Sequence, residues 1–360
     1  MRECIPPSVV DMGSLGLKPF SKLFDDFFDF PRAGMFFLLL VECAVRDLSM
    51  EGLCNRKFES SDRFFHYMGE RGLEDATWYC NLLLRRCFDM LLKARWHWRG
   101  VYLAIDYNDV EYHGEDPLMV HDAMKKSVRH QHVHVLRYAT IAIVGTRFKF
   151  TLAVTCVSRE DRPEDVVRRL LDMVPGELKV KGVLLDKGFY NANVLNEVGK
   201  DTDYLVPVKK FEGMKITYRI AEITDKWRWD HTLNGGKENE HKTTVYLQEV
   251  GMDDYIGMVT NKDMSMTDVS VLFDVYRKRW NVENSYKEKD NYRIKTNSRN
   301  HSYRILIYTI SHLLVNLLTI TKRKNKTTIT HDDMKHILEY LLNAEPGTTK
   351  RLTKKLIILS

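Results

Sequence analysis

The sequence predicts a mixed α/β protein in which a mixed sheet is flanked by helices and preceded by a helical segment. Three observations support this fold class. Helical periodicity covers residues 34–98, short apolar runs separated by polar turns cover 100–206, and helical periodicity returns from about residue 267. The 360-residue chain is 44% hydrophobic and 29% charged. This composition allows a buried core and excludes a disordered chain.

The order of elements after residue 100 narrows the fold. We expect strands at 101–106, 134–145 and 147–157, a helix at 163–173, a strand at 181–186, a helix at 190–199 and a strand at 203–208. Three strands followed by helix, strand, helix and strand is the order of a ribonuclease-H-like core. In such a sheet the first strand is central, and the strand after the first helix pairs beside it. Asp106 and Asp186 would then be neighbours.

The remaining segments divide the chain further. Residues 209–262 contain candidate strands at 215–220, 243–247 and 255–260, with a turn at Asn234, and form a β-rich insertion. The predicted organisation is a helical, DNA-binding domain at 1–98, a ribonuclease-H-like core in two parts at 99–208 and 266–325, the insertion at 209–265, and a basic helical tail at 326–360. Further helices are expected at about 35–47, around Cys54, from Ser60 or Ser61 to Met68, and at 74–95, 267–292, 301–321 and 331–343.

Charge and cysteine usage favour an intracellular protein that binds nucleic acid. The net charge is +6, and residues 276–324 hold twelve Lys or Arg against three acids. Such a basic surface around one acid favours nucleic-acid contact. None of the six cysteines forms a Cys-x-x-Cys pair, so a zinc finger is excluded and reduced thiols are expected. The apolar stretch at 305–321 is interrupted by polar residues and is predicted to be a buried core helix.

Three carboxylates stand in settings suited to metal-dependent phosphodiester chemistry. Asp106 and Asp186 each close an apolar run, and Glu283 lies on a basic, helix-compatible stretch. Two Mg²⁺ ions can activate an oxygen nucleophile and stabilise the leaving oxygen, and Mg²⁺ prefers oxygen ligands. Asp106 would bridge both ions, while Asp186 and Glu283 would each complete one. Taken singly, an acid at a strand end is more often a turn or capping residue, so the inference depends on all three acids converging.

Other motifs are less specific. Residues 50–71 fit a helix-turn-helix, although helical bundles show the same pattern. Trp227 and Trp229 alternate with cations and could stack on an unpaired base, or pack in the core of the insertion. His130, His132 and His134 alternate at strand spacing, but an exposed strand start or loop is the simpler interpretation than a metal site.

The motifs around the three acids resemble those of DDE transposases of prokaryotic, archaeal-type insertion sequences. Tyr276, Arg279 and Glu283 match the Tyr-x-x-Arg-x-x-x-Glu part of a signature that continues x6-Lys. The Asp-Lys-Gly-Phe-Tyr run from Asp186 resembles the segment of the second acid. Asp106, followed by Tyr-His-Gly at 112–114, resembles that of the first, and Lys-Thr-Asn-Ser-Arg at 295–299 resembles the stretch after the Glu. The resemblance covers about residues 100–325.

One position departs from the signature. Its Lys would fall at 290, where this chain has Asp290. Successive helical residues advance by about 100°, so position 290 would return to the face of Glu283. Lys287 lies close to that face and could substitute for the missing cation, whereas Lys289 would point away unless the helix bends. An anion at this place could weaken binding of the transposon end.

The resemblance implies a Mg²⁺-dependent transposase, with Mn²⁺ as a substitute metal. Asp106, Asp186 and Glu283 would be the catalytic metal ligands. The residues expected to contact DNA phosphates are Tyr276, Arg279, Lys287, Lys289 and Arg299. The partners would be double-stranded terminal inverted repeats and target DNA, bound by a homodimer without membrane association, in the cytoplasm at the nucleoid. Two alternatives are a catalytically impaired or domesticated DNA-binding derivative, and a ribonuclease-H-like nuclease or resolvase without strand transfer.

Overall fold

The computed structural model describes two compact parts of the chain. The described residues are 17–28, 33–57, 61–93, 100–124, 132–145, 148–209, 217–220, 227–251, 254–263, 269–325 and 328–343. Internal contacts group Trp98–Asn284 into one part, called here the sheet unit. They group Met1–His97 with Ser285–Ser360 into the other, called here the helical unit. The domain boundaries expected from the sequence remain a prediction.

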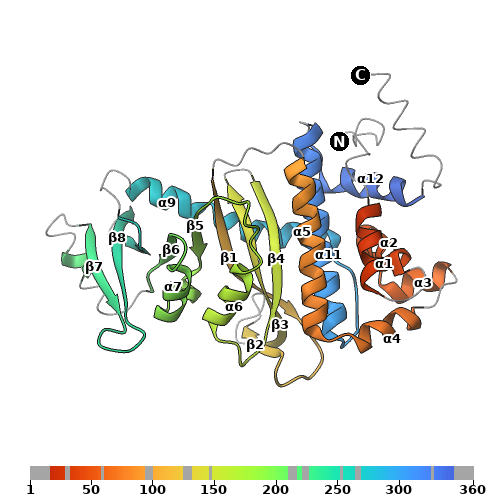
Figure 1. Cartoon of the computed structure of the whole chain (residues 1–360), viewed down its shortest axis with the longest axis horizontal. Helices are drawn as coiled ribbons and strands as arrows, with labels where there is room; N and C mark the ends of the chain where they lie inside the picture. Colours follow the sequence, from red (N-terminus) through yellow and green to blue (C-terminus); the bar gives the residue numbers. More distant parts are fainter. Residues whose placement is uncertain are drawn as a thin grey trace. The chain divides into compact units, whose positions relative to one another are not determined.

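The sheet unit is built on one mixed sheet of nine strands (Figure 1). The strand order is β2-β3-β1-β5-β6-β9-β8-β7, with β4 paired to β3. The strands are β1 (Val101–Glu111), β2 (Val120–Met124), β3 (His132–Gly145), β4 (Phe148–Val157), β5 (Val180–Leu185), β6 (Tyr204–Pro207), β7 (Arg228–Leu233), β8 (His241–Gly251) and β9 (Asp254–Thr260). The short strand β2 was not predicted from the sequence.

The centre of the sheet agrees with the predicted core. β1 is antiparallel to β3 and parallel to β5, so the strand after the first helix lies beside the first strand. β1 and β3 are apolar over long runs because helices or neighbouring strands cover them, and Leu103, Ala104 and Ile105 are all buried. This arrangement places the ends of the apolar runs before Asp106 and Asp186 side by side.

The strands of the predicted insertion continue the same sheet. β6 pairs with β9 through Val206–Val259 and Pro207–Met258, and β9 then pairs with β8 and β8 with β7. The β7–β8 hairpin turns at Asn234, which has a positive φ of 54°, as the turn prediction required. Residues 217–220 are helical, so the strand predicted at 215–220 is wrong for that part, and 215–216 lie outside the described residues.

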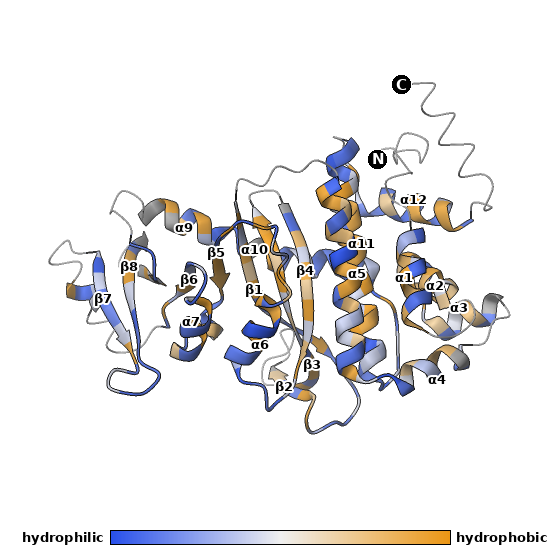
Figure 2. Ribbon diagram, viewed as in Figure 1, coloured by the Kyte–Doolittle hydropathy of each residue, from blue (hydrophilic) through white to orange (hydrophobic). Residues whose placement is uncertain are grey.

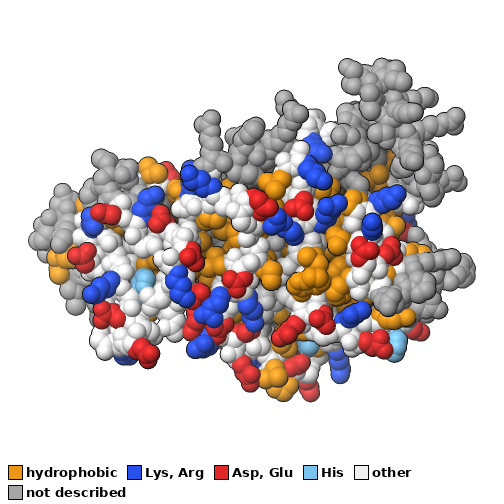
Figure 3. Space-filling view, in the orientation of Figure 1, with side chains coloured by type: hydrophobic (Ala, Val, Ile, Leu, Met, Phe, Trp, Pro, Cys, Tyr) orange, Lys and Arg blue, Asp and Glu red, His pale blue; other side chains and the backbone are white. Residues whose placement is uncertain are grey.

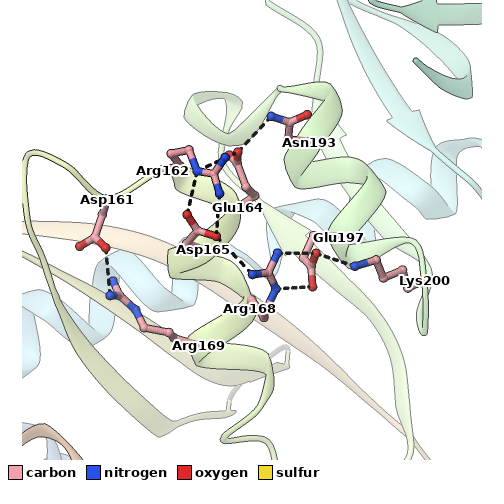
Figure 4. A network of polar contacts seen from close by, with 9 residues as sticks. All are labelled: Asp161, Arg162, Glu164, Asp165, Arg168, Arg169, Asn193, Glu197 and Lys200. Carbon is pink, nitrogen blue, oxygen red and sulfur yellow. Dashed lines mark hydrogen bonds and ion pairs between the residues drawn. The ribbon is translucent and has the colours of Figure 1, made fainter. Parts of the chain in front are cut away.

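Two helices, α6 (Pro163–Leu171) and α7 (Ala192–Val198), pack against each other in the sheet unit. α6 begins at Pro163, a residue favoured in the first turn of a helix. α7 begins after Asn191, whose side chain accepts a hydrogen bond from the Asn193 amide. Charged side chains of both signs mix over these helices (Figure 3). Ion pairs join the helices into a network that includes Arg168 and Glu197 (Figure 4).

A break divides the helical segment in which the chain passes from the sheet unit to the helical unit. The sequence predicted one helix over 267–292, but the structure has α9 (Val269–Arg277) and α10 (Trp280–Lys289), followed by a 3₁₀ turn, Asp290–Tyr292. Lys278 and Arg279 form the turn between α9 and α10. The Arg279 amide donates to the Tyr276 carbonyl at 2.8 Å, which is an i−3 contact in place of the α-helical i−4 contact.

The helical unit contains seven named helices. They are α1 (Lys18–Phe27), α2 (Ala33–Arg46), α3 (Met50–Lys57), α4 (Asp62–Glu70), α5 (Leu73–Lys93), α11 (His301–Asn325) and α12 (His331–Asn343). Their apolar faces, including much of α5 and α11, are visible in Figure 2. Aromatic rings fill this core, with Phe24 packed against Phe37 and Tyr79. Ser49 accepts a hydrogen bond from the Gly52 amide, so it caps α3, the helix predicted around Cys54.

α11 is a buried helix, as expected for residues 305–321. It is long and apolar enough to cross a membrane, but 89% of its apolar window is buried inside the protein. That burial is what a core helix shows, and the length and apolar composition of α11 are by themselves weak evidence for a membrane span. Cys80 and Cys87 on α5 are also buried, and both are free thiols, as predicted.

Candidate active site

Two adjacent strands bring the first two acids together. The parallel register of β1 and β5 ends at the pair Ile105–Leu185. Asp106 and Asp186 are the next residues on their strands, although eighty positions separate them in the sequence. The expectation that these two acids are neighbours therefore agrees with the strand pairing.

Each of these carboxylates has one oxygen directed by the backbone. Asp106 Oδ1 accepts from the Tyr107 amide at 2.9 Å, and Asp186 Oδ2 accepts from the Gly188 amide at 3.4 Å. Asp186 thus caps the 3₁₀ turn Lys187–Phe189 that follows β5. The second oxygen of each carboxylate is left to face a common partner.

That common partner is the guanidinium of Arg279. Its Nη1 donates to Asp106 Oδ2 at 3.1 Å, and its Nη2 lies 3.6 Å from Asp186 Oδ1. Its Nη2 also donates to Glu283 Oε1 at 2.7 Å. The three acids that the sequence singled out therefore converge on one cation.

The four side chains differ in how far they are exposed to solvent. The Arg279 side chain is 6% exposed, and those of Asp106, Asp186 and Glu283 are 14%, 37% and 50% exposed. The site thus has a closed side at Asp106 and an open side at Glu283. A polymeric substrate could approach the acids from the open side.

The break between α9 and α10 places Arg279 among the acids. Because Arg279 lies in the turn and Glu283 lies in the first turn of α10, both side chains reach the same cluster, at i and i+4. Arg279 also lies over the Tyr276 ring, with its guanidinium carbon 5.5 Å from the ring centroid. The signature residues Tyr276, Arg279 and Glu283 therefore form one contact group.

The electrostatics of Asp106 are unusual for a residue beside an arginine. Burial raises its pKa to about 6, and the neighbouring Asp186 and Glu283 add to the rise, while Arg279 opposes it. Desolvation alone would lower the pKa of Arg279, but Tyr276, Asp106 and Asp186 raise it above its ordinary value. The formal charges at the site are three acids against one guanidinium, and Arg279 does not offset the effect of burial on Asp106.

Comparisons with known proteins identify the family of the chain. Residues 99–318 match the family described as "Transposase DDE domain". The chain belongs to this family. A search of curated proteins finds no match.

Among solved structures, the fold is similar to a cryo-EM structure of a piggyBac transposase synaptic complex with hairpin DNA. The TM-score is 0.50 at 14% sequence identity, over 89% of this chain and 74% of that one. At this identity the likeness supports the fold, namely the mixed sheet flanked by helices of a ribonuclease-H-like transposase core. Transposase DDE domains use divalent metal ions, and the family therefore raises the question of whether these residues could hold them.

The donor set of this transposase DDE domain fits such a metal. Three carboxylates supply the oxygen ligands that Mg²⁺ and Mn²⁺ accept, and the Asp106 and Asp186 oxygens that face Arg279 point to one place. Among the described residues no ready-made cluster of three metal-ligating side chains is found. The guanidinium of Arg279 lies between the three acids, so a metal held by all three would have to displace it.

The other predicted contact residues of the transposase domain lie in the helical unit. Lys287 and Arg299 are exposed. Lys289 is buried, and its Nζ donates to Asp290 Oδ1 at 2.9 Å and lies 5.1 Å from the Tyr308 ring centroid. α10 ends at Lys289, so the helical phase assumed for Asp290 in the sequence analysis does not extend to that residue.

Sequence reasoning missed the central place of Arg279. It assigned Arg279 to a DNA phosphate, because helical spacing gave no sign of a turn at 278–279. The histidines behave as expected of a strand start, since His132 and His134 are exposed at the beginning of β3, while His130 lies outside the described residues. Trp227 and Trp229 are both half-buried.

Proposed function

We propose that this protein is an insertion-sequence transposase that cleaves the ends of its element and joins them to target DNA, using Mg²⁺ or Mn²⁺. The observation that carries the proposal is the convergence of Asp106, Asp186 and Glu283 on one guanidinium. When bound there, a pair of divalent ions would activate the attacking oxygen and stabilise the leaving oxygen. Asp106, Asp186 and Glu283 are the residues that would hold them.

The chain's own residues supply orientation and charge. The Tyr107 and Gly188 amides fix one oxygen of each aspartate, so the other oxygen needs little rearrangement to serve as a ligand. Arg279, once displaced from the acids, has the planar donor pair suited to a phosphate. Tyr276 lies against its guanidinium and limits where that side chain can go.

The partners follow from this chemistry. We propose terminal inverted repeats and target DNA as substrates, with Lys287 and Arg299 as phosphate contacts from the basic segment. Lys289 would have to leave Asp290 and its buried place to join them. We further propose a homodimer that pairs two ends, and a cytoplasmic, nucleoid-associated protein without membrane attachment. Residues 50–71, whose short helices α3 and α4 match the predicted helix-turn-helix elements, are our candidate for end recognition.

Cleavage of DNA duplexes that flank the reading frame tests the activity. Wild-type protein with Mg²⁺ should nick a duplex that carries a terminal repeat, and chelation should stop the reaction. Asp106→Asn should lose cleavage but retain DNA binding, because it removes a metal ligand and keeps the size of the side chain. Wild-type protein that binds the repeat and cleaves nothing in either metal would contradict the proposal.

Two outcomes would favour other functions. Asp290 in place of the signature Lys favours an impaired DNA-binding derivative, and Asp290→Lys should then restore cleavage of the same duplex. Cleavage without joined products in a plasmid target would favour a ribonuclease-H-like nuclease or resolvase. Joined products would exclude that alternative.

A further inference from the structure

The strand pairing ends just before the two aspartates. The last β1–β5 register pair is Ile105–Leu185, and both chains continue into Asp106 and Asp186. Beyond that pair the two segments separate, since β1 goes on to Glu111 while the other chain turns into the 3₁₀ helix Lys187–Phe189. The pairing of β1 with β5 therefore does not by itself fix the distance between the two carboxylates. A further contact beyond the Ile105–Leu185 pair is needed to hold that distance.

An aromatic pair supplies a contact at that place. The rings of Tyr107 and Phe189 stack with centroids 4.6 Å apart and an interplanar angle of 24°. Tyr107 follows Asp106 directly, and Phe189 is the third residue after Asp186. Because successive strand residues point to opposite faces, Tyr107 and Asp106 lie on opposite faces of β1. The Ile105–Leu185 pair and the ring stack thus bracket the two acids along the chain.

Neither ring is free to move far. Phe189 is 1% exposed, and burial raises the pKa of Tyr107 to about 12. The guanidinium carbon of Arg137 lies 5.5 Å from the Tyr107 ring centroid. Arg137 is itself fixed by a bidentate pair with its register partner Asp109, at 2.7 and 2.8 Å. The β3 strand therefore holds Tyr107 through Arg137, and Tyr107 in turn holds Phe189.

We propose that Tyr107 and Phe189 are positioning residues that set the separation of Asp106 and Asp186 and thereby the divalent-metal affinity of the site. The inference rests on the proposed function, since it assumes that these acids bind metal. Tyr107 and Phe189 touch neither metal nor DNA in this role. Loss of the stack lets the turn after β5 shift, so the two carboxylates no longer present their oxygens to one ion.

The test measures Mn²⁺ binding to the full chain. The paramagnetic resonance signal of free Mn²⁺ reports how much of the ion stays unbound. Tyr107→Leu and Phe189→Leu should raise the Mn²⁺ dissociation constant about 10-fold, as for other residues that orient metal ligands. Tyr107→Phe keeps the ring and should bind like wild type. Phe150→Leu, a buried β4 position outside the stack, is the matched control for a general loss of packing and should not change Mn²⁺ affinity.

The outcomes separate the inference from the proposed function. Unchanged Mn²⁺ affinity in folded Phe189→Leu would overturn the positioning role, as would an equal loss in Phe150→Leu or in Tyr107→Phe. Phe189→Met, whose longer and more flexible side chain adapts to the buried space without a ring, replaces the leucine variant if that variant does not fold. Wild-type protein without saturable Mn²⁺ binding, or binding that persists in Asp106→Asn, would instead overturn the proposed metal site.

Discussion

Two arginine–carboxylate clusters in the sheet unit differ in how their charges are matched. In the α6–α7 network the charges are matched locally, with Arg168 paired to Glu197 through two hydrogen bonds of 3.0 Å and Lys200 adding a contact of 2.7 Å (Figure 4). In the candidate active site three acids share the buried Arg279. The first cluster holds two helices together, and the second concentrates unbalanced negative charge.

The pKa values move in opposite directions in the two clusters. Hydrogen bonds from Arg168 and Lys200 lower the pKa of Glu197 to about 2. Burial and neighbouring acids raise the pKa of Asp106 to about 6 despite its contact with Arg279. The comparison shows that an arginine contact alone does not identify a structural ion pair. A buried carboxylate whose pKa stays raised beside an arginine is a candidate for a functional site.

The largest difference is expected in catalysis. Glu283→Gln should lower metal-dependent cleavage at least about 100-fold, because it removes a charged ligand from the proposed metal site. Glu197→Gln makes the same chemical change in the other cluster and should leave the cleavage rate unchanged. Rate measurements on one terminal-repeat duplex compare the two variants directly. Equal losses would show that the clusters do not differ in function.

The next difference is expected in stability. Arg279→Met should lower the free energy of unfolding of the metal-free protein by about 3 kcal/mol, because it leaves a buried acid among like charges. Arg168→Met, at an exposed position, should cost much less than Arg279→Met. Urea unfolding at pH 7 measures both values.

Adding Mn²⁺ sharpens that measurement. The ion should stabilise Arg279→Met more than wild type, because no guanidinium competes for the acids in the variant. Arg168→Met should gain no more from Mn²⁺ than wild type does. A smaller gain in Arg279→Met than in wild type would contradict the view that Arg279 stands in for the metal.

The two clusters should respond to pH with opposite sign. The raised pKa of Asp106 favours its neutral form in the folded protein, so its contribution to stability should fall by about 1–3 kcal/mol as the pH rises from about 4 to 6. Asp106→Asn should remove this decline from the metal-free protein. Unfolding curves at several pH values, with wild type alongside, test the sign. A wild-type contribution that increases over this interval would contradict it.

The smallest effect is expected at Glu197. Its lowered pKa means that its stabilising contribution is complete above about pH 4.5 and is lost as the pH falls toward 2. Because its partners Arg168 and Lys200 are exposed, the contribution should be about 1 kcal/mol or less. Glu197→Gln should cost that amount at pH 7 and clearly less at pH 2, as measured by urea unfolding. A variant that is equally destabilised at both pH values would rule out the ion pair as the cause.

Local periodicity predicted most of the sheet and helices, because apolar runs of five to ten residues mark strands regardless of what they pair with. The predicted strand at 147–157 differs from Phe148–Val157 by one residue, and the predicted helix at 331–343 matches His331–Asn343. β2 was missed because its sequence Val-His-Asp-Ala-Met has no apolar run. Pairing partners carry no local signal, so the continuity of β6 with β9 could not be read from the sequence.

The sequence predicted that Asp106, Asp186 and Glu283 come together. It did not predict that Arg279 would pair with all three acids. Strand ends and a motif resemblance identified Asp106, Asp186 and Glu283, and β1–β5 pairing and one shared arginine bring them together. The turn at 278–279 was missed, because Arg277, Lys278 and Arg279 are all compatible with a helix. Only the tertiary environment determines that Arg279 turns toward the acids.

The pairing of β6 with β9 has a consequence for engineering this chain. A deletion that removes β7, β8 and β9 would strip β6 of its neighbour on that side and leave its backbone amides and carbonyls as an open sheet edge next to β5. Open edges recruit strands from other molecules, so the shortened protein should aggregate instead of yielding a minimal enzyme. β9 thus covers the edge of the sheet at β6. A shortened protein that stays folded would need another strand in the place of β9.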